Sequence, residues 1–143
     1  MGGQVMKITT KGRYAVRVMI DLAENAGSAA VPLRGISERQ EVSLKYLEQI
    51  MTLLSEGGLV VGTRGNGGGY TLSRPASEIS AAAILSAVEK ENGAPLHEDA
   101  NPKAAAFWQG LEKTMSDYLA GQTLEEIVKN SRSSRRDPSI WIL

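Results

Sequence analysis

Apolar residues recur every three to four positions along several stretches of the chain, and each such stretch predicts an amphipathic helix. In residues 9–26 the repeating positions include Ala15, Met19 and Leu22, and Gly27 provides a stop signal. A shorter helix is expected directly after Pro32. The helices predicted in this way are 9–26, 33–40, 44–56, 80–89, 102–121 and 123–130.

The third of these helices, residues 44–56, has two clearly different faces. Ser43 is a favourable N-cap, and the pair Gly57-Gly58 ends the helix. Only a tight turn at residues 41–42 separates it from the helix before it, so the two are expected to form a helix-turn-helix. The apolar stripe consists of Leu44, Leu47, Met51 and Leu54 with Ile50 beside it, and the polar face consists of Lys45, Glu48, Gln49 and Thr52.

A β-hairpin is predicted directly after this helix-turn-helix. Residues 59–63 are mostly β-branched and apolar, and residues 70–72 are the expected partner strand. Between them, Arg64 opens a run of six residues that includes four glycines, which tolerates unusual backbone angles and close approach of the main chain. Such a run alone is better explained as a plain flexible hairpin, but after a helix-turn-helix it indicates a wing.

The helix predicted over residues 102–121 would extend about 28 Å. Its apolar stripe could belong to an ordinary core. A head of about 90 residues offers little surface on which so long a helix could be buried, so we favour contact with a partner chain. The stripe, which is then the expected dimer interface, consists of Phe107, Leu111, Met115 and Tyr118.

The order of these elements predicts a mainly α fold with a small β-hairpin (α+β), in which a winged helix-turn-helix head is followed by a long dimerisation helix. We expect residues 1–5 to be a tag or frayed tail and residues 6–76 to be the winged head. Residues 77–101 are expected to form a connecting helix and loop, and residues 102–143 the dimerisation helix and C-terminal segment.

Composition excludes several classes of function. The absence of cysteine excludes disulfides, thiolate nucleophiles and cysteine-ligated metals. The single histidine, His97, is expected to be a solvent-exposed loop residue, and a metal site with Glu98 and Asp99 is the weaker alternative. No nucleophile–base pair and no carboxylate pair at catalytic spacing can be named, so no enzymatic activity is expected. Without an apolar run long enough to span a bilayer or a visible secretory leader, a cytoplasmic location is expected.

Charge is distributed unevenly along the chain. Residues 1–75 carry nine Lys/Arg and six Asp/Glu, a balance of +3, and residues 76–143 carry seven and ten, a balance of −3. A basic front half is a mild indication of a polyanionic partner. Because an amphipathic helix with a polar outer face fits the DNA major groove, a DNA-binding head is predicted. A winged-helix protein-interaction module and a regulator switched by a small-molecule effector stay open as alternatives.

Four stretches of the sequence form a recognisable set: KITTKGRYA from Lys7, ISERQ from Ile36, SLKYLEQ from Ser43 and RGNGGGY from Arg64. They resemble the Rrf-two family of bacterial winged-helix transcription regulators. The stretches occur in family order and at family-like spacing, and the close match covers residues 6–90. The later part resembles the family only in its pattern of a helix, a polar loop and a long helix.

The resemblance implies a homodimeric repressor or activator on a palindromic operator. The helix of residues 102–121 would dimerise, and the recognition helix and wing would each contact one half of the operator. Glu48 matches a position that tunes base selectivity in the iron–sulfur cluster regulators of the family, and Arg64 matches the wing arginine that reaches into the minor groove. The predicted DNA-binding residues are Lys11, Tyr14, Ser43, Lys45, Tyr46, Glu48, Gln49, Arg64, Gly67 and Gly68.

Two departures from the family pattern matter. Many members have glycine where Glu41 stands, so a positive φ there would strain this residue by about 1 kcal/mol. The cluster-binding members place three cysteines in the loop that matches residues 91–103, and this chain has none. A sensor with thiolate-bound iron–sulfur is therefore excluded by residue type, and no cofactor is expected.

The cysteine-free loop resembles the subgroup that represses genes of cysteine and sulfur metabolism. Members of that subgroup respond through O-acetylserine sulfhydrylase (cysteine synthase). The resemblance therefore implies three partners: double-stranded DNA, a second copy of the chain and this enzyme. No membrane partner is expected.

Overall fold

The computed structural model describes residues 8–25, 27, 29–65, 67–89 and 96–134, with only the backbone of residues 131–134. The predicted tail at residues 1–5, the loop residues 91–95 and the apolar residues 140–143 lie outside this part of the chain. The elements that it contains are α1 (Thr10–Asn25), α2 (Leu33–Gln40), α3 (Leu44–Glu56), β1 (Val60–Thr63), β2 (Gly69–Leu72), the 3-10 helix η1 (Ala76–Glu78), α4 (Ala81–Val88), α5 (Pro102–Gly121) and α6 (Leu124–Ser134).

Most predicted elements are confirmed to within two residues at each end, including the antiparallel hairpin and the long α5. Two details differ. The 3-10 helix η1 was not predicted, and α6 continues to Ser134 beyond its predicted end at Asn130. A capping box opens α6, because Thr123 N–H donates to Glu126 Oε1 and Glu126 N–H donates to Thr123 Oγ1.

The hairpin is attached to the segment that precedes α2. Val60 pairs with Leu72, and at the far end of the ladder Thr63 pairs with Gly69. On its other side, Tyr70 exchanges two backbone hydrogen bonds with Val31, at 2.8 and 2.9 Å. A side chain at Gly69 would collide with the Val31 backbone, so this close approach requires glycine. The wing is thereby fixed to the start of the helix-turn-helix.

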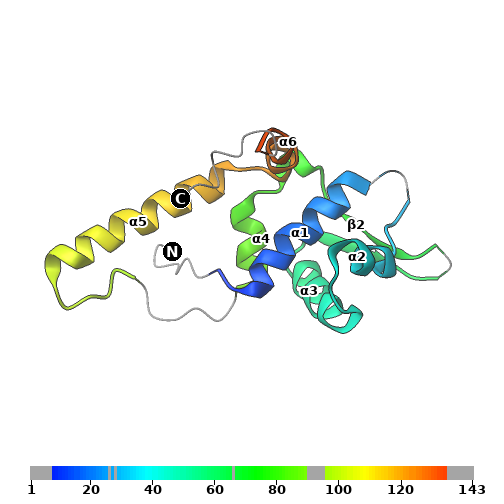
Figure 1. Cartoon of the computed structure of the whole chain (residues 1–143), viewed down its shortest axis with the longest axis horizontal. Helices are drawn as coiled ribbons and strands as arrows, with labels where there is room; N and C mark the ends of the chain where they lie inside the picture. Colours follow the sequence, from blue (N-terminus) through cyan, green and yellow to red (C-terminus); the bar gives the residue numbers. More distant parts are fainter. Residues whose placement is uncertain (1–7, 26, 28, 66, 90–95, 135–143) are drawn as a thin grey trace.

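A single hydrophobic core joins the head, α4 and α6. In Figure 1, α4 lies between α1 and the long α5, and α6 lies beside the end of α5. Leu124 at the start of α6 is fully buried in this core, so the chain returns to the head after α5. The largest fully buried side chains are Val18, Met19, Leu22, Ile36, Leu47, Ile50, Met51, Leu54, Leu59, Ile79, Ile84 and Leu124.

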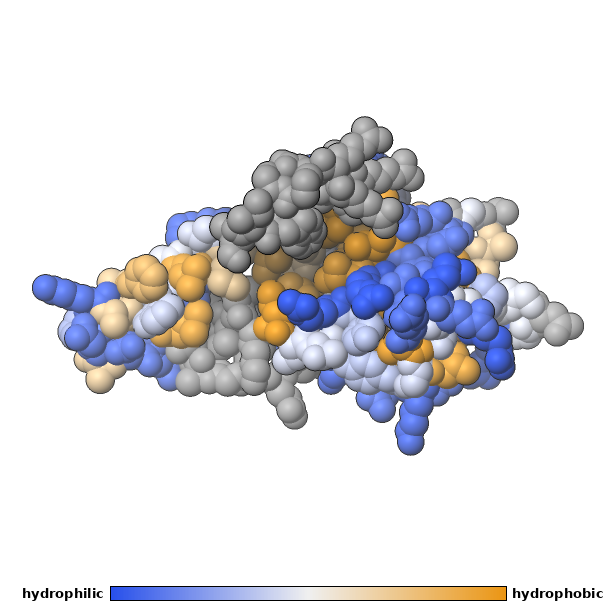
Figure 2. Space-filling model, in the orientation of Figure 1, coloured by the Kyte–Doolittle hydropathy of each residue, from blue (hydrophilic) through white to orange (hydrophobic). Residues whose placement is uncertain are grey.

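The long helix α5 projects from the head as an arm (Figure 1). Its start is capped by Asn101, whose side chain accepts hydrogen bonds from the backbone N–H groups of Lys103 and Ala104. Among its residues only Glu112 is buried. In Figure 2, apolar residues gather on the visible face of the arm, whereas much of the visible head surface is hydrophilic.

The turn between α2 and α3 is strained at one residue. Glu41 has φ 53° and ψ 51°, which is the left-handed conformation. This is the positive φ under which the sequence predicts strain at Glu41. Apart from glycines, it is the only residue with positive φ in the described part of the chain. A side chain in this conformation costs about 1 kcal/mol, whereas glycine adopts it freely.

Glu41→Gly is therefore expected to raise the free energy of unfolding by up to about 0.6 kcal/mol, which is the relief of about 1 kcal/mol of strain less about 0.4 kcal/mol or more for the entropy that glycine adds to the unfolded chain. Urea unfolding followed by circular dichroism measures this change. Glu38→Gly is the control, because Glu38 lies within α2, where glycine costs about 1 kcal/mol. A loss of stability in Glu41→Gly would contradict the strain.

Candidate nucleic-acid interface

The helix α3 presents the two faces that its sequence pattern predicts. Leu47, Ile50, Met51 and Leu54 are fully buried. Leu44, which was also predicted in the apolar stripe, is instead 37% exposed, because it stands in the first turn of α3, at the edge of the head. Lys45, Glu48, Gln49 and Thr52 are exposed on the opposite face. The apolar face fixes the helix in the head, so the polar face stands outward in a defined orientation. This is the arrangement that a helix needs in order to read base edges in the DNA major groove.

The first turn of α3 is built on α1. Ser43 caps α3, because its Oγ accepts the backbone N–H of Tyr46. The ring of Tyr46 packs edge-to-face on Tyr14 of α1, with 5.8 Å between the ring centroids. The guanidinium of Arg17 lies over the Tyr14 ring at 5.1 Å. Burial raises the pKa of Tyr46, and Tyr14 and the charge of Glu89 raise it further, so its hydroxyl keeps its proton.

The wing contributes an exposed arginine and a stretch of backbone that glycines leave uncovered by side chains. Arg64 and Gly67 are exposed at its tip. Gly68 is crowded by the carbonyl oxygens of Thr63 and Gly65, so the turn leaves no room for a side chain there. A hollow of about 400 Å³ lies between the wing and the start of α2, with Leu33, Arg64 and Tyr70 among its lining residues. A backbone or sugar group of a nucleic acid could approach the main chain at this place.

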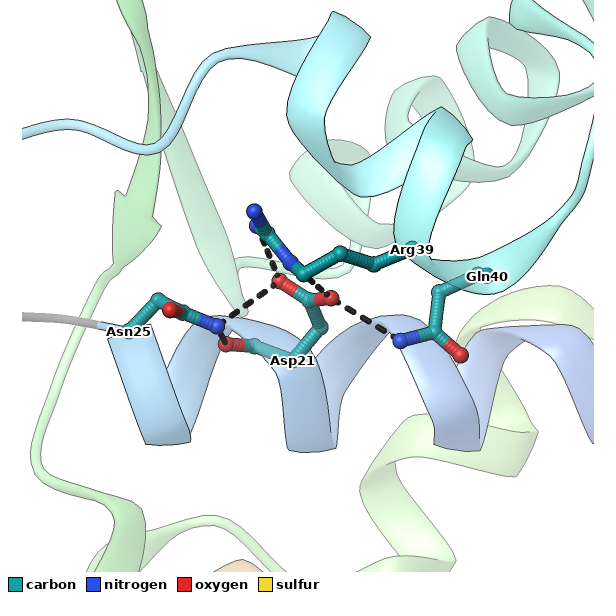
Figure 3. Close-up of polar contacts among 4 residues, drawn as sticks. All are labelled: Asp21, Asn25, Arg39 and Gln40. Atoms are coloured by element: carbon teal, nitrogen blue, oxygen red, sulfur yellow. Dashed lines mark hydrogen bonds and ion pairs between the residues drawn. The ribbon is translucent and has the colours of Figure 1, made fainter.

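A polar network joins α1 to α2, and sequence patterns did not predict it. The buried carboxylate of Asp21 accepts two hydrogen bonds from Arg39, at 2.9 and 2.8 Å, and one from Gln40 at 2.9 Å (Figure 3). Asn25 donates to the same carboxylate, and Arg17 reaches Gln40 from α1. Burial alone would raise the pKa of Asp21, but these hydrogen bonds and the charge of Arg39 lower it below its ordinary value.

Glu112 holds residues 96–97 onto the arm. Its carboxylate accepts the backbone N–H of Leu96 at 2.8 Å and lies 2.7 Å from Nδ1 of His97. The hydrogen bond from His97 lowers the pKa of Glu112, and the Leu96 N–H adds to this effect against the opposing effect of burial. His97 lies in the predicted loop, but it is only partly solvent-exposed, since its side chain is 36% exposed and is paired with Glu112. The partner was not foreseen because it lies 15 residues away, on another element.

The structure brings most of the predicted DNA-binding residues into two groups. Ser43 and residues 44–49 form the N-cap and first turns of α3. Tyr14 on α1 joins this group through its contact with Tyr46, and Lys11 precedes Tyr14 on the same helix. Arg64, Gly67 and Gly68 form the second group at the wing. Both tyrosines are half-buried and pack against the hydrophobic core. Lys11 is also half-buried, so the cations most open to solvent in the two groups are Lys45 and Arg64.

The sequence profile of the Rrf2 family, described as an iron-dependent transcriptional regulator, matches residues 8–130. The chain belongs to the Rrf2 family. It is 41% identical over 132 residues to the HTH-type transcriptional regulator IscR of Xenorhabdus nematophila, a match that covers 87% of this chain and 80% of that protein. Like its relatives, this Rrf2 protein is a DNA-binding transcriptional regulator of the helix-turn-helix type.

Solved structures of Rrf2 proteins share the fold. The structure of CymR, described as the global cysteine regulator of B. subtilis, superposes with a TM-score of 0.78 at 32% identity and covers 88% of this chain and 98% of that one. IscR of T. potens has a TM-score of 0.76 at 33% identity, with 90% of each chain covered. The winged-helix prediction is thereby confirmed. Within the described residues, no helix is long and apolar enough to cross a membrane.

The iron in the family description does not fit the donor atoms of this chain. No cysteine is available for an iron–sulfur cluster. Within the described part of the chain, no three His, Asp or Glu side chains are grouped so that they could hold a metal ion. The one histidine is engaged with Glu112. The residues present therefore do not form an iron site of the thiolate type.

Proposed function

We propose that this Rrf2 regulator acts as a homodimer that places α3 of each protomer in the major groove of a palindromic operator, with Arg64 of each wing at the adjacent minor groove. The observation that carries the proposal is the exposed polar face of α3, whose opposite apolar face is buried in the core. The wing beside it carries the exposed Arg64 at its tip. Lys45, Glu48 and Gln49 would then meet base edges. Lys11, Tyr14 and Tyr46 would meet the backbone at the first turn of α3.

The exposed arm supports the homodimer. Phe107 is 64% exposed, Leu111 38% and Tyr118 64%, although all three are large apolar or aromatic side chains on one stripe of α5. Met115 on the same stripe is half-buried. A contiguous apolar stripe on a helix that projects from the head is the kind of surface that marks a protein interface. A second antiparallel copy of α5 would cover it through the same residues.

The genes under control are proposed to belong to cysteine and sulfur metabolism, with the regulator acting as a repressor. The support is the cysteine-free loop together with the fold shared with CymR, whose description names it a global cysteine regulator. O-acetylserine sulfhydrylase stays a partner predicted from resemblance. The regulator is expected to have no enzymatic activity, as its relatives are named for transcriptional regulation.

Genome-wide mapping of DNA bound by the protein tests this function directly. Enriched palindromic sites upstream of sulfur-metabolism genes are the expected result. Enriched sites upstream of other genes would support a DNA-binding regulator but contradict its control of cysteine and sulfur metabolism. An absence of enriched sites, with a protein partner recovered instead, would favour the winged-helix interaction module.

Arg64→Ala is expected to weaken operator binding by about tenfold, because a good contact between an arginine and a base is worth about 1–3 kcal/mol and about 1.4 kcal/mol corresponds to tenfold in affinity. Lys129→Ala is the matched control, since Lys129 is an exposed cation on α6, far from the wing. Fluorescence anisotropy at fixed salt measures both. Equal losses in the two variants would remove the wing from the proposed interface.

Glu48→Ala is expected to relax sequence preference more than it reduces affinity. A carboxylate on the reading face can accept a hydrogen bond from cytosine N4 and repels the acceptor-rich edge of guanine. The ratio of affinities for the operator and for a singly substituted operator should therefore fall severalfold. A parallel loss for both DNAs would show that Glu48 contributes no selectivity.

A further inference from the structure

The carboxylate of Glu89 joins the end of α4 to the start of α1. Its Oε2 accepts the backbone N–H of Thr9 at 2.6 Å, and its Oε1 accepts the Thr9 hydroxyl at 2.9 Å. These residues are 80 positions apart in the sequence. Gly12 is buried one turn later, and a Cβ atom there would collide with Glu89 Oε2. Glycine at this position therefore makes room for the carboxylate.

The same end of α1 carries proposed DNA contacts. Lys11 lies within this first turn, and Tyr14 follows in the next and packs on Tyr46 of the recognition helix. The charge of Glu89 also acts on Tyr46 and contributes to its raised pKa. One carboxylate therefore holds the start of α1 and faces the start of α3.

If only electrostatics is considered, the negative charge of Glu89 beside the proposed DNA contacts opposes DNA binding. Phosphates repel it, although the positive end of α1 offsets part of the repulsion. Removing a carboxylate that acted only through its charge would tighten binding. Removing one that holds contact residues in position would weaken binding, so the two roles predict opposite signs.

We propose that Glu89 is a positioning residue for DNA binding, which holds the first turn of α1 against α4 and so fixes Lys11 and the Tyr14–Tyr46 pair in the orientation that meets the DNA backbone. This proposal rests on the proposed operator interface. It adds a residue that contacts no DNA and that lies outside the helix-turn-helix and wing.

Glu89→Ala tests the sign of the effect. The probe is a DNA duplex selected by the wild-type protein from a random-sequence pool. Affinity is expressed per folded dimer, and sedimentation and circular dichroism measure the concentration of folded dimer in each preparation. Binding is expected to weaken by roughly five- to tenfold, the change that follows when one or two backbone contacts are misplaced. Glu24→Ala is the control, because it removes an exposed charge at the other end of the same helix and should change affinity less than twofold.

A double-mutant cycle with Gly12→Ala separates positioning from general damage. The added methyl group displaces the Glu89 carboxylate, so Gly12→Ala should weaken binding like Glu89→Ala. In the Glu89→Ala background the methyl group meets no carboxylate, and the remaining close atom is Leu85 Cδ2 at 3.2 Å, a side-chain end that needs to move by only a few tenths of an ångström, so the methyl group should cost little further. Glu89→Gln, which preserves the shape, should fold and should bind with intermediate affinity.

Weaker binding in both single variants with a non-additive double variant supports the proposal. Unchanged or tighter binding of Glu89→Ala and Glu89→Gln would overturn it, as would fully additive losses. If the wild-type protein selects no duplex from the pool, the proposed DNA interface fails first, and the role of Glu89 fails with it.

Discussion

Replacement of Leu111 by aspartate is expected to convert the protein from dimers to monomers and to weaken operator binding by roughly 100-fold or more. The variant places a charge in the middle of the apolar stripe of α5, where a second copy would have to desolvate it. Loss of the dimer removes the gain from holding two half-sites at once, which is typically 10²- to 10⁴-fold. Because Leu111 is 38% exposed within its own chain, the monomer should still fold.

Sedimentation velocity and operator titration measure the two effects of this substitution. Gln109→Asp is the matched control, because it adds the same charge to an exposed position on the opposite face of α5. This control should remain dimeric and bind normally. A dimer retained in Leu111→Asp would place the interface on another surface.

Replacement of Asp21 by alanine should lower the free energy of unfolding by about 2–3 kcal/mol. The carboxylate is almost completely buried and accepts charge-assisted hydrogen bonds from Arg39, with further ones from Gln40 and Asn25 (Figure 3). Its loss leaves the amide of Gln40 without an acceptor, whereas Arg39 is 45% exposed and can be hydrated. Asp117→Ala provides the comparison, since its pair with Lys113 is exposed and worth at most about 0.5 kcal/mol.

The same carboxylate makes stability depend on pH in a defined direction. The pKa of Asp21 is lower in the folded protein than the ordinary value near 3.9. Its stabilisation is therefore complete above that value and is lost as the pH falls through the lower folded pKa. As the pH is lowered below about 4, the wild-type protein should lose more stability than Asp21→Asn, in denaturant titrations at each pH. Parallel losses would show that the pair contributes nothing to acid sensitivity.

Local patterns predicted much of this fold correctly because the relevant physics is local. The two faces of α3 follow from helical periodicity, and its cap follows from Ser43. The capping box of α6 likewise needs only two residues three positions apart. Glu41 also has the positive φ under which strain was predicted, because so short a turn can reverse the chain in only a few backbone conformations.

The features that sequence patterns missed join residues far apart in the chain. Asp21 and Arg39 are 18 positions apart, and Thr9 and Glu89 are 80 apart, so no period or motif connects them. Gly12 was the one available signal, since a buried glycine inside a helix often marks a close approach by another group. The DNA contacts themselves stay predictions, because the chemistry of an exposed side chain does not show what it touches.

The arm has a consequence for how the regulator responds to its own abundance. Among the described residues, α5 buries only Glu112, and the proposed association with a second copy would cover the apolar stripe. Below the dissociation constant of the proposed dimer, the concentration of the DNA-binding species rises with the square of the total protein concentration. Doubling the copy number would then raise the dimer fourfold. Synthesis and degradation of the chain would thus act as a steep control of operator occupancy, without any bound signal.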